Sequence, residues 1–463
     1  MDPITSQIIR TVGGEGSVLY QVTLNYNLSP TGGRWHYAAD GRYKFACPYN
    51  FTSTNWGSYW LEMDPSDGSV LFENNTFYNS TTYPRGGGAN VYRGNQNKGV
   101  WIDDDTYSYA GHQNTYYTIY RGDSGSAGML AREAGSYASY VEYCQQVVVG
   151  SSHIASGGNS AGGASTYYPT LRSTNFVTAG ANQPVRYVNF STSSSVNRVC
   201  DLEFDLSNNT IWAATQRYIS GSNYYTYIWA GYVDPTTKTI GAGFNKCQMA
   251  GYASYANWVL RDSATGNVYG SFANTGAPSS TIIMGLSTPT GYFNESPTKL
   301  WEKGLTLSTY NCGQSPSHAR YAYNGSIYFA AGQLVHNKLV RMDASTGDVT
   351  GTWELTGSYA SSYYISNIER TPDDKWALDI CEDGQGPTTC LMILSDDDFE
   401  NGVTFDSAPV GFEPTTLATA ATTTYVSFTN DTANTTAFSS SNTTALSTGG
   451  TSTTVTASTS VYE

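Results

Sequence analysis

The stretch KLVRMDASTGDVTGTWEL, from Lys338 to Leu355, places two short apolar runs on either side of an Asp-Ala-Ser-Thr-Gly segment. The side chain of Asp343 suits a tight turn because it can accept a hydrogen bond from the backbone two residues further on. Gly347 can adopt the positive φ that a bulged hairpin turn requires. We therefore predict a β-hairpin over this stretch.

The same pattern recurs along the chain. Each copy has an Asp, then a turn-forming residue or Lys four positions later, then Val or Ile six positions later. No helical stretch separates the copies, and a hairpin repeated in this way predicts radial repetition of small sheets, an all-β propeller. The five copies are Asp64/Gly68/Val70, Asp205/Asn209/Ile211, Asp234/Lys238/Ile240, Asp262/Gly266/Val268 and Asp343/Gly347/Val349.

The spacing of the copies predicts about seven blades, within a range of six to eight, in a domain of residues 1–412. The positions of Asp205 and Asp262 differ by 57 residues, and this period is applied over Arg34–Phe405. The alternating stretch Ser17–Asn25 is expected to be an early strand that completes the last blade. The Gly- and Ser-rich region Gly150–Ser165 is expected to be a long surface loop.

The closest copies of the turn, Asp343-Ala-Ser-Thr-Gly347-Asp-Val349 and Asp262-Ser-Ala-Thr-Gly266-Asn-Val268, resemble the D-x-x-T-G-x-V hairpins of quinoprotein-like β-propellers. In those proteins the turn joins the two outer strands of a blade. The resemblance implies the architecture only. The tryptophan that those families dock after the turn does not recur regularly here, so no cofactor is expected.

Composition and charge exclude several classes of function. Lys and Arg number only 23 and the net charge is −14, which disfavours nucleic acid as a partner because phosphate binding requires a basic surface. No apolar run approaches 18 residues, so no membrane span is expected. The first residues, MDPITSQIIR, lack the apolar region of a signal peptide. Either the numbering begins at a mature end or the protein is not secreted, and the remaining composition favours the first interpretation.

The C-terminal residues 413–463 differ from the rest of the chain. Between Pro414 and Glu463 there are 26 Ser or Thr in 50 residues and neither Lys nor Arg. This composition is typical of a disordered or glycosylated stalk. The segments TTYVSFT and TTVTAST nevertheless contain enough β-branched residues to form strands on a neighbouring surface, including that of another subunit.

The seven cysteines have neither the CxxC spacing nor the Cys/His spacing of a zinc site, and no metal site is expected. Cys381 and Cys390 flank the loop EDGQGPTT between two apolar runs. In a hairpin these two positions face each other, so we expect a disulfide between them, with two reduced core thiols as the alternative.

Eleven N-x-S/T sequons are potential glycosylation sites. A chain this rich in Asn, Ser and Thr contains many of them by chance, so their placement in expected turns and in the tail is more informative than their number. Together with the tail they predict an extracellular glycoprotein. The acceptor residues are Asn27, Asn50, Asn74, Asn79, Asn189, Asn208, Asn294, Asn324, Asn430, Asn434 and Asn442.

Other short motifs have a functional and a structural interpretation. The RGD of Arg121–Asp123 matches an adhesion tripeptide but falls in an expected Gly-rich hairpin turn, and the overlapping GDSGS lacks the His and Asp context of a serine protease. Asp103–Asp105 and Asp396–Asp398 are candidates for the paired carboxylates of a propeller glycosidase, with Asp104 directed into the channel. Solvated turns are the structural interpretation of both Asp runs. We expect no catalytic residue.

These observations predict a secreted, glycosylated structural or adhesive surface protein that assembles with copies of itself into a filament, coat or matrix. The Tyr-rich strands suit both self-association and packing between strands. A carbohydrate-binding propeller that uses exposed aromatic side chains is the second interpretation. A propeller glycoside hydrolase is the third.

Overall fold

The computed structural model contains only strands and their connections among the residues that it describes. These are residues 6–12, 17–24, 34–52, 55–79, 100–109, 115–123, 126–134, 145–150, 153–163, 166–175, 185–188, 198–220, 223–238, 240–249, 254–274, 280–287, 298–305, 319–331, 337–357, 363–382, 389–395, 399, 402, 411–415, 419–420, 430–438, 451–454 and 458–461.

Most strands form antiparallel meanders in which each strand pairs with the next along the chain. The first meanders are β3 Arg34–Tyr37, β4 Tyr43–Thr52, β5 Asn55–Met63, β6 Val70–Asn79; β7 Val100–Asp103, β8 Thr106–Tyr109, β9 Thr115–Asp123, β10 Ser126–Ala134; and β11 Gln145–Gly150, β12 His153–Gly163, β13 Thr166–Asn175, β14 Val185–Val188. The next are β15 Arg198–Asp205, β16 Thr210–Ser220, β17 Asn223–Val233, β18 Ile240–Met249; and β19 Ser254–Arg261, β20 Val268–Asn274, β21 Ser280–Ser287, β22 Thr298–Leu305. The last are β23 Arg320–Tyr323, β24 Ser326–Ala331, β25 Lys338–Asp343, β26 Val349–Thr356; and β27 Tyr363–Arg370, β28 Trp376–Glu382, β29 Thr389–Ser395.

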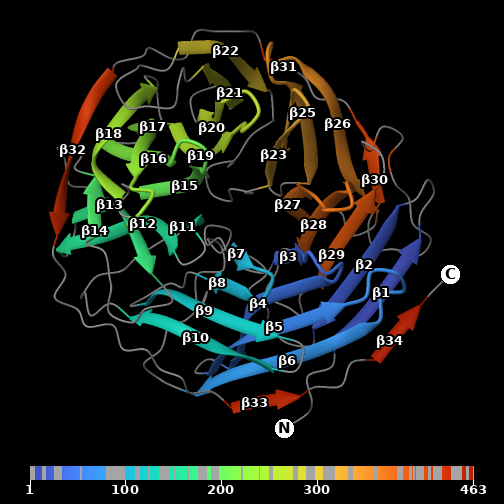
Figure 1. The fold of residues 1–463 in the computed structure, drawn as a ribbon. Coiled ribbons are helices and arrows are strands. Elements are labelled where there is room, and N and C mark those ends of the chain that lie inside the picture. The colour runs from blue at the N-terminus through green and yellow to red at the C-terminus, as the bar shows by residue number, and fades with distance from the viewer. Residues whose placement is uncertain are drawn as a thin grey trace.

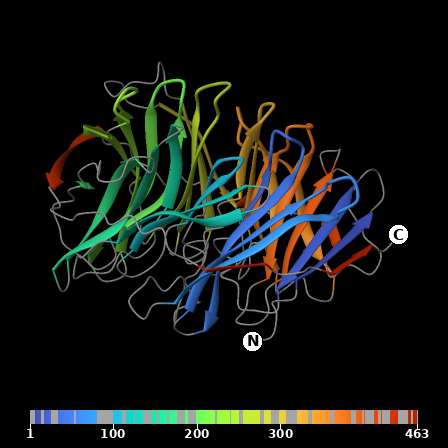
Figure 2. The ribbon, with the colours of Figure 1, turned by 60° about the horizontal axis from the view of Figure 1, so that its bottom comes forward.

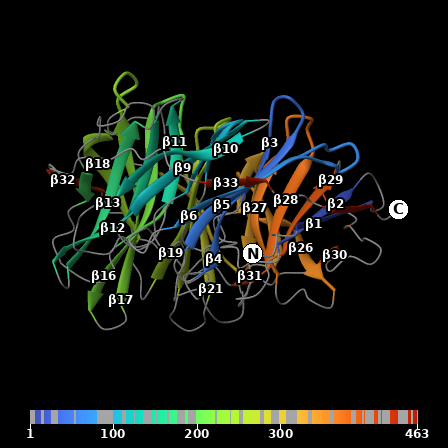
Figure 3. The ribbon, with the colours of Figure 1, turned by 90° about the horizontal axis from the view of Figure 1, so that it is seen from below.

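The sheets are arranged around a common centre (Figure 1). The first strand of each meander lies toward the centre, and the later strands lie progressively further out. Figures 2 and 3 show the same sheets from the side, standing next to one another around the ring. This arrangement is a β-propeller, and each meander is one of its blades.

The N-terminal strands close the ring. β2, Val18–Leu24, pairs antiparallel with β29 from Val18 opposite Leu394 to Thr23 opposite Thr389, and β1, Ser6–Val12, pairs with β2 on its outer side. The blade that begins with β27 is therefore completed by a strand from the other end of the domain. This pairing confirms the prediction for the stretch Ser17–Asn25.

The five Asp turns share one geometry. In each turn the Asp Oδ1 accepts a hydrogen bond from the N–H two residues on, with distances of 2.8 to 3.0 Å. The residue four positions after the Asp has a φ between 51° and 75°, the left-handed region that glycine tolerates best. Lys238 and Asn209 adopt it as well as the three glycines. The hairpins predicted from the repeated pattern are therefore confirmed.

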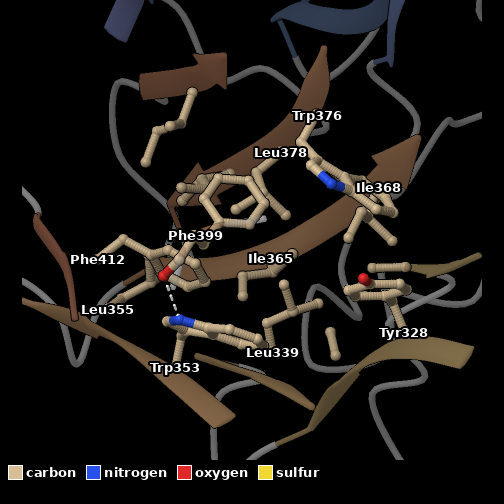
Figure 4. Packing of buried hydrophobic residues seen from close by; sticks show 14 of the residues in the cluster. Tyr328, Leu339, Trp353, Leu355, Ile365, Ile368, Trp376, Leu378, Phe399 and Phe412 are labelled. Carbon is tan, nitrogen blue, oxygen red and sulfur yellow. Dashed lines mark hydrogen bonds between the residues drawn. The ribbon is translucent and has the colours of Figure 1, made fainter. Parts of the chain in front are cut away.

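Apolar clusters lie between neighbouring blades. In β24, Ile327 and Phe329 pack into the cluster shared with the β19–β22 blade, whereas the intervening Tyr328 packs against the β27–β29 blade. Successive strand residues point to opposite faces, so the run IYFAA, residues 327–331, is apolar throughout because both of its faces are covered. Figure 4 shows the second cluster, in which Trp353 Nε1 donates to the Phe399 carbonyl oxygen.

The turns also pack against the preceding blade. Trp301, on β22, donates a 2.9 Å hydrogen bond to the carbonyl of Ala344 in the turn between β25 and β26. A Cβ added to Gly347 in this turn would stand 2.5 Å from a ring carbon of the same Trp301. At the ring closure, Tyr20 Oη donates to the carbonyl of Pro65, 2.6 Å away, in the equivalent position of another Asp turn. Aromatic donors thus attach these two turns to the blade before them.

The Gly-rich region Gly150–Ser165 is not a loop, contrary to the prediction. Most of it forms β12, which pairs with β11 and β13. A Cβ added to Gly157 would stand 2.9 Å from Val199 Cγ1 and 3.1 Å from Leu202 Cδ1, both on β15. Glycine is required here because the next blade packs directly onto the backbone.

The C-terminal segment adds strands to the outside of the ring (Figures 1 and 3). We call these five strands the belt: β30 Gly411–Pro414, β31 Thr419–Ala420, β32 Asn430–Phe438, β33 Thr451–Thr454 and β34 Ser458–Val461. They pair in turn with β26, β22, β18 together with β14, β6 and β1. Pairing starts at Gly411, before the expected domain boundary between residues 412 and 413. Phe412 is fully buried opposite Leu355.

Replacement of Gly347 by Ala tests how the turns are attached. Gly347→Ala imposes a positive φ on a side chain and also pushes its Cβ into Trp301, whereas Gly325→Ala, at φ 76°, meets no atom within 4 Å. The control should cost about 1–2 kcal/mol in unfolding free energy from backbone strain. Gly347→Ala should cost about 1–3 kcal/mol more from overpacking. Equal losses in urea unfolding would show that Trp301 does not restrain the turn.

Candidate functional site

Polar side chains gather on one face of the propeller, where the tight hairpin turns lie. In a meander, the turn after the first strand and the turn after the third strand fall at the same end of the sheet, as the hydrogen bond from Ala344 N to Gly325 O at 2.8 Å shows. We call this end the turn face. Two groups of interacting side chains from different blades lie at this face, and a third lies in the interior along the innermost strands.

The first group joins the β3–β6 blade to the β7–β10 blade. His36 Nε2, on β3, lies 2.7 Å from Oδ1 of Asp104 in the turn after β7. The Ala39 N–H donates to the other oxygen of Asp104 at 3.1 Å. The His36 ring stacks on Trp101 with ring centroids 4.9 Å apart and an angle of 19°. One carboxylate thus fixes the neighbouring turn and the imidazole.

Buried charges extend this group toward the interior. Lys44 Nζ donates to Asp105 Oδ1 at 2.8 Å and lies 3.8 Å from Glu62 Oε1. Glu62 has no exposed side-chain surface, and it also accepts from Arg42 at 3.0 Å and from Trp60 Nε1 at 3.3 Å. A buried carboxylate is tolerated only when paired and hydrogen-bonded, and Glu62 meets this condition within its own blade. Lys44 then links Glu62 to Asp105 of the second blade.

Asp104 is held in its ionised form. Burial acts to raise its pKa, but hydrogen bonds from His36 and Ala39 and the charges of His36 and Lys44 outweigh it and lower the pKa below its usual value. An ionised carboxylate only accepts hydrogen bonds, so His36 Nε2 carries the proton that they share. A glycosidase acid needs a raised pKa. Asp104 therefore has the electrostatics of a structural acceptor.

The second group connects the innermost strands of three blades. Arg320, on β23, donates from Nε to the Val259 carbonyl at 2.6 Å and pairs through Nη2 with Asp201 Oδ2 at 2.6 Å. The same Asp201 oxygen accepts from the Val259 N–H at 3.0 Å. Arg320 and Asp201 are both buried. Loss of one partner of such a pair costs about 3–5 kcal/mol, so this pair serves stability and blade order.

The third group is a half-exposed aromatic surface between the β23–β26 and β27–β29 blades. The Arg370 guanidinium lies 4.8 Å from the ring centre of Tyr323 and 4.9 Å from that of Trp376. Tyr321 packs edge-on against the same Trp376. Asp374, whose side chain is 75% exposed, accepts from Arg370 Nε at 3.1 Å. Tyrosine faces beside paired charges have the chemistry that binds a sugar ring or a partner protein.

The expected disulfide pair is correctly aligned. Cys381, on β28, stands directly opposite Cys390, on β29. Directly opposite residues of an antiparallel pair have Cα atoms about 4.5–5.5 Å apart, which is within the range for a disulfide. The disulfide itself stays a prediction.

The RGD tripeptide is not in a turn, contrary to the prediction. Arg121–Asp123 ends β9, where Arg121 pairs with both Thr106 of β8 and Gly128 of β10. Gly122 and Asp123 pair with Ala127 and Ser126 of β10. The tripeptide therefore lies in paired strand backbone and not in a loop. The other Asp run, Asp396–Asp398, lies outside the described residues.

The sequons fall in different surroundings. Asn324 is exposed in the turn between β23 and β24, and Asn208 is half-exposed in the turn after β15, where its amide donates to Asp205 at 3.0 Å. Other acceptors lie on strands, and the rest lie outside the described residues. On strands are Asn50, Asn74, Asn79, Asn430 and Asn434; outside are Asn27, Asn189, Asn294 and Asn442.

Sequence reasoning missed His36, Lys44, Glu62, Arg320 and Arg370. Each is a single polar residue in or at the end of a strand, and its partners lie on other strands, in turns or on other blades, so no recognised motif marks it. The one signal available was the presence of charged residues in largely apolar strands of a chain with few charges. Among the described residues, no three His, Cys, Asp or Glu converge as metal ligands. In the same residues no helix has the length and apolarity to cross a membrane.

No protein-family model matches this sequence. No match to a curated protein is found either. Among solved structures, the chain is similar at 10% identity to Pseudomonas fluorescens PhoX in complex with vanadate (TM-score 0.30, 86% of this chain and 89% of that one). It is similar at 8% to the tricorn protease (TM-score 0.33, 89% and 49%) and at 10% to the family 43 glycoside hydrolase YxiA of Bacillus licheniformis (TM-score 0.26, 85% and 99%). At these values no activity is transferred to this chain.

Removal of the Asp104 carboxylate tests its role through pH. Because its folded pKa is lowered, its contribution to stability is complete above the unfolded pKa of about 3.9 and is lost as the pH falls through the folded value. Unfolding free energy of the wild type should therefore fall more steeply below about pH 4 than that of Asp104→Asn. His36→Ala, which removes one donor, should give an intermediate slope. Parallel curves for all three proteins would contradict this assignment.

Proposed function

We propose that this protein is a secreted, glycosylated structural or adhesive surface component that assembles with copies of itself into a filament, coat or matrix. The belt is the observation that carries the proposal. A Ser/Thr-rich segment with the composition of a stalk forms strands and adds them to outer edges of the propeller. It therefore has the properties of a chain that attaches by strand addition.

The chemistry of the belt supports this proposal. Proteins usually protect strand edges from unwanted pairing with charged residues, especially Lys, or with Pro. Beyond Pro414 the belt segment contains no Lys, Arg or Pro, and Asp431 and Glu463 are its acidic residues. Its strands therefore do not discourage further pairing. Since small polar side chains contribute little burial, the backbone hydrogen bonds supply most of the attachment.

Surface chemistry supports an extracellular location. The net charge of −14 with few Lys residues suits a soluble coat component, and Asn324 offers a sequon in an exposed turn. N-linked glycans require such accessible positions in the secretory pathway. The alignment of Cys381 with Cys390 is compatible with an oxidising compartment.

We also propose that the ring has seven blades, with β2 as the fourth strand of the blade that β27 begins. The nine-stranded sheet supports this count because it contains the β11–β14 and β15–β18 meanders, joined through β32. The shared Asp-turn geometry supports a relation to quinoprotein-like blades in architecture.

Carbohydrate binding is a second candidate function. The Tyr321, Tyr323 and Arg370 surface favours it because half-exposed tyrosine rings can stack on a sugar face. Binding on a glycan array that is lost in Tyr323→Ala, with Tyr232→Ala on another blade as the control, would support this candidate. Binding that is absent, or unchanged by Tyr323→Ala, would exclude this surface. Hydrolysis has no such support, since Asp104 has a lowered pKa.

Truncation after Thr415 tests the self-assembly. It keeps β30, with its hydrogen bond from Thr415 N to Thr352 O at 2.8 Å, and removes the rest of the belt. The full chain should form ordered assemblies in electron micrographs, and the truncated chain should not. Ala433→Pro/Ala437→Pro, which disrupts pairing without altering a sequon, should also abolish assembly, whereas Ala445→Pro, which follows the Asn442 sequon outside the belt strands, should not. Full-length monomers at all concentrations would contradict the proposal.

A further inference from the structure

The belt strand β32 connects two blades. Its first half, Asn430–Asn434, pairs with β18, and its second half, Thr435–Phe438, pairs with β14. Without β32 these blades are separate meanders, and with it they form one nine-stranded sheet. The edges of β14 and β18 therefore make a single composite docking surface for one nine-residue strand.

The register on this surface is chemically specific. Asp431 stands opposite Lys246, so an acidic position faces a basic one. At the other end Phe438 stands opposite Val185, which pairs two apolar positions. Opposite charges and apolar pairs across strands each contribute about 0.2–1 kcal/mol. A one-residue shift would remove both matches, so the surface recognises this strand in one register.

The connections on both sides of β32 set how far the strand can move while β31 and β33 stay on their own blades. Residues 421–429 precede it and residues 439–450 follow it. Extended at about 3.3 Å per residue, these connections span up to about 30 Å and about 40 Å. Departure of β32 does not open the ring, because the ring is closed by the pairing of β2 with β29.

We propose that β32 is exchanged between copies, so that Asn430–Phe438 of one copy occupies the β14/β18 surface of a second. This inference rests on the proposed self-assembly and identifies its contact. The strand makes the same pairs within one copy and between two, so concentration decides which arrangement dominates. Attachment of a strand to its own chain through short connections corresponds to an effective concentration in the mM range. Exchange is therefore rare in dilute solution and favoured where copies crowd together.

A native cysteine makes the exchange measurable. Cys247 stands directly opposite Asn430, so Asn430→Cys creates a thiol pair at a separation suited to a disulfide. One copy carries Asn430→Cys with Cys247→Ser and a first tag, and a second carries the native Cys247 and Asn430 with another tag. Neither can form this disulfide within itself. A disulfide between the two tags therefore reports β32 of the first copy on β18 of the second.

The two copies are mixed at about 1 mM, the range of the effective concentration of β32 within one copy. The mixture is then oxidised and separated without reductant. We expect the mixed-tag product to be at least tenfold more abundant than with Cys247→Ser in the second copy, and to decline on dilution. Thr432→Ala in place of Asn430→Cys removes the same sequon without adding a thiol and should give no product. Ordered assemblies without the mixed-tag disulfide would overturn the exchange and leave self-assembly intact. Monomers throughout would overturn both.

Discussion

The structure depends on burial of both faces of each blade against its neighbours. In β24 and β16, alternate residues belong to different clusters: Ile327 packs against one neighbouring blade and Tyr328 against the other, and Ile211 and Trp212 are divided in the same way. An isolated blade would expose apolar surface on two sides, at about 25 cal/mol per Å². Each blade is therefore stable only with a neighbour on both sides, so the row of blades must close into a ring. The N-terminal strand β2 provides this closure on β29.

Polar interactions determine how the blades meet. Apolar faces of similar composition pack in many ways, whereas a buried charge has low energy only beside its partner. Lys44 with Asp105, and Arg320 with Asp201, each join two different blades. The Asp turns contribute further fixed contacts, such as the bond from Trp301 to Ala344. The result is a rigid face on which the Arg370 surface is held in place.

The outer edges have the opposite requirement. A blade ends in a strand whose outward N–H and C=O groups are open to pairing with any chain. The belt covers edges of β26, β22, β18, β14, β6 and β1 with strands of the same molecule. The same segment that protects an edge within one copy can connect copies when exchanged, because the hydrogen bonds are identical. This dual role links a Ser/Thr-rich tail to the assembly that we propose.

The sequence by itself determined the local features: the hairpins, their Asp turns, the positive φ four residues on, the early strand that closes the ring and the alignment of Cys381 with Cys390. These follow from alternation and turn chemistry within about fifteen residues, where backbone geometry leaves few choices. Only the tertiary structure decided that Gly157 lies in a strand under Val199, that His36 meets Asp104, and where the belt strands pair. Each of these contacts joins residues from different blades, or the tail to a blade. Their pairing depends on which faces come together in the closed ring, and no pattern within one segment encodes that.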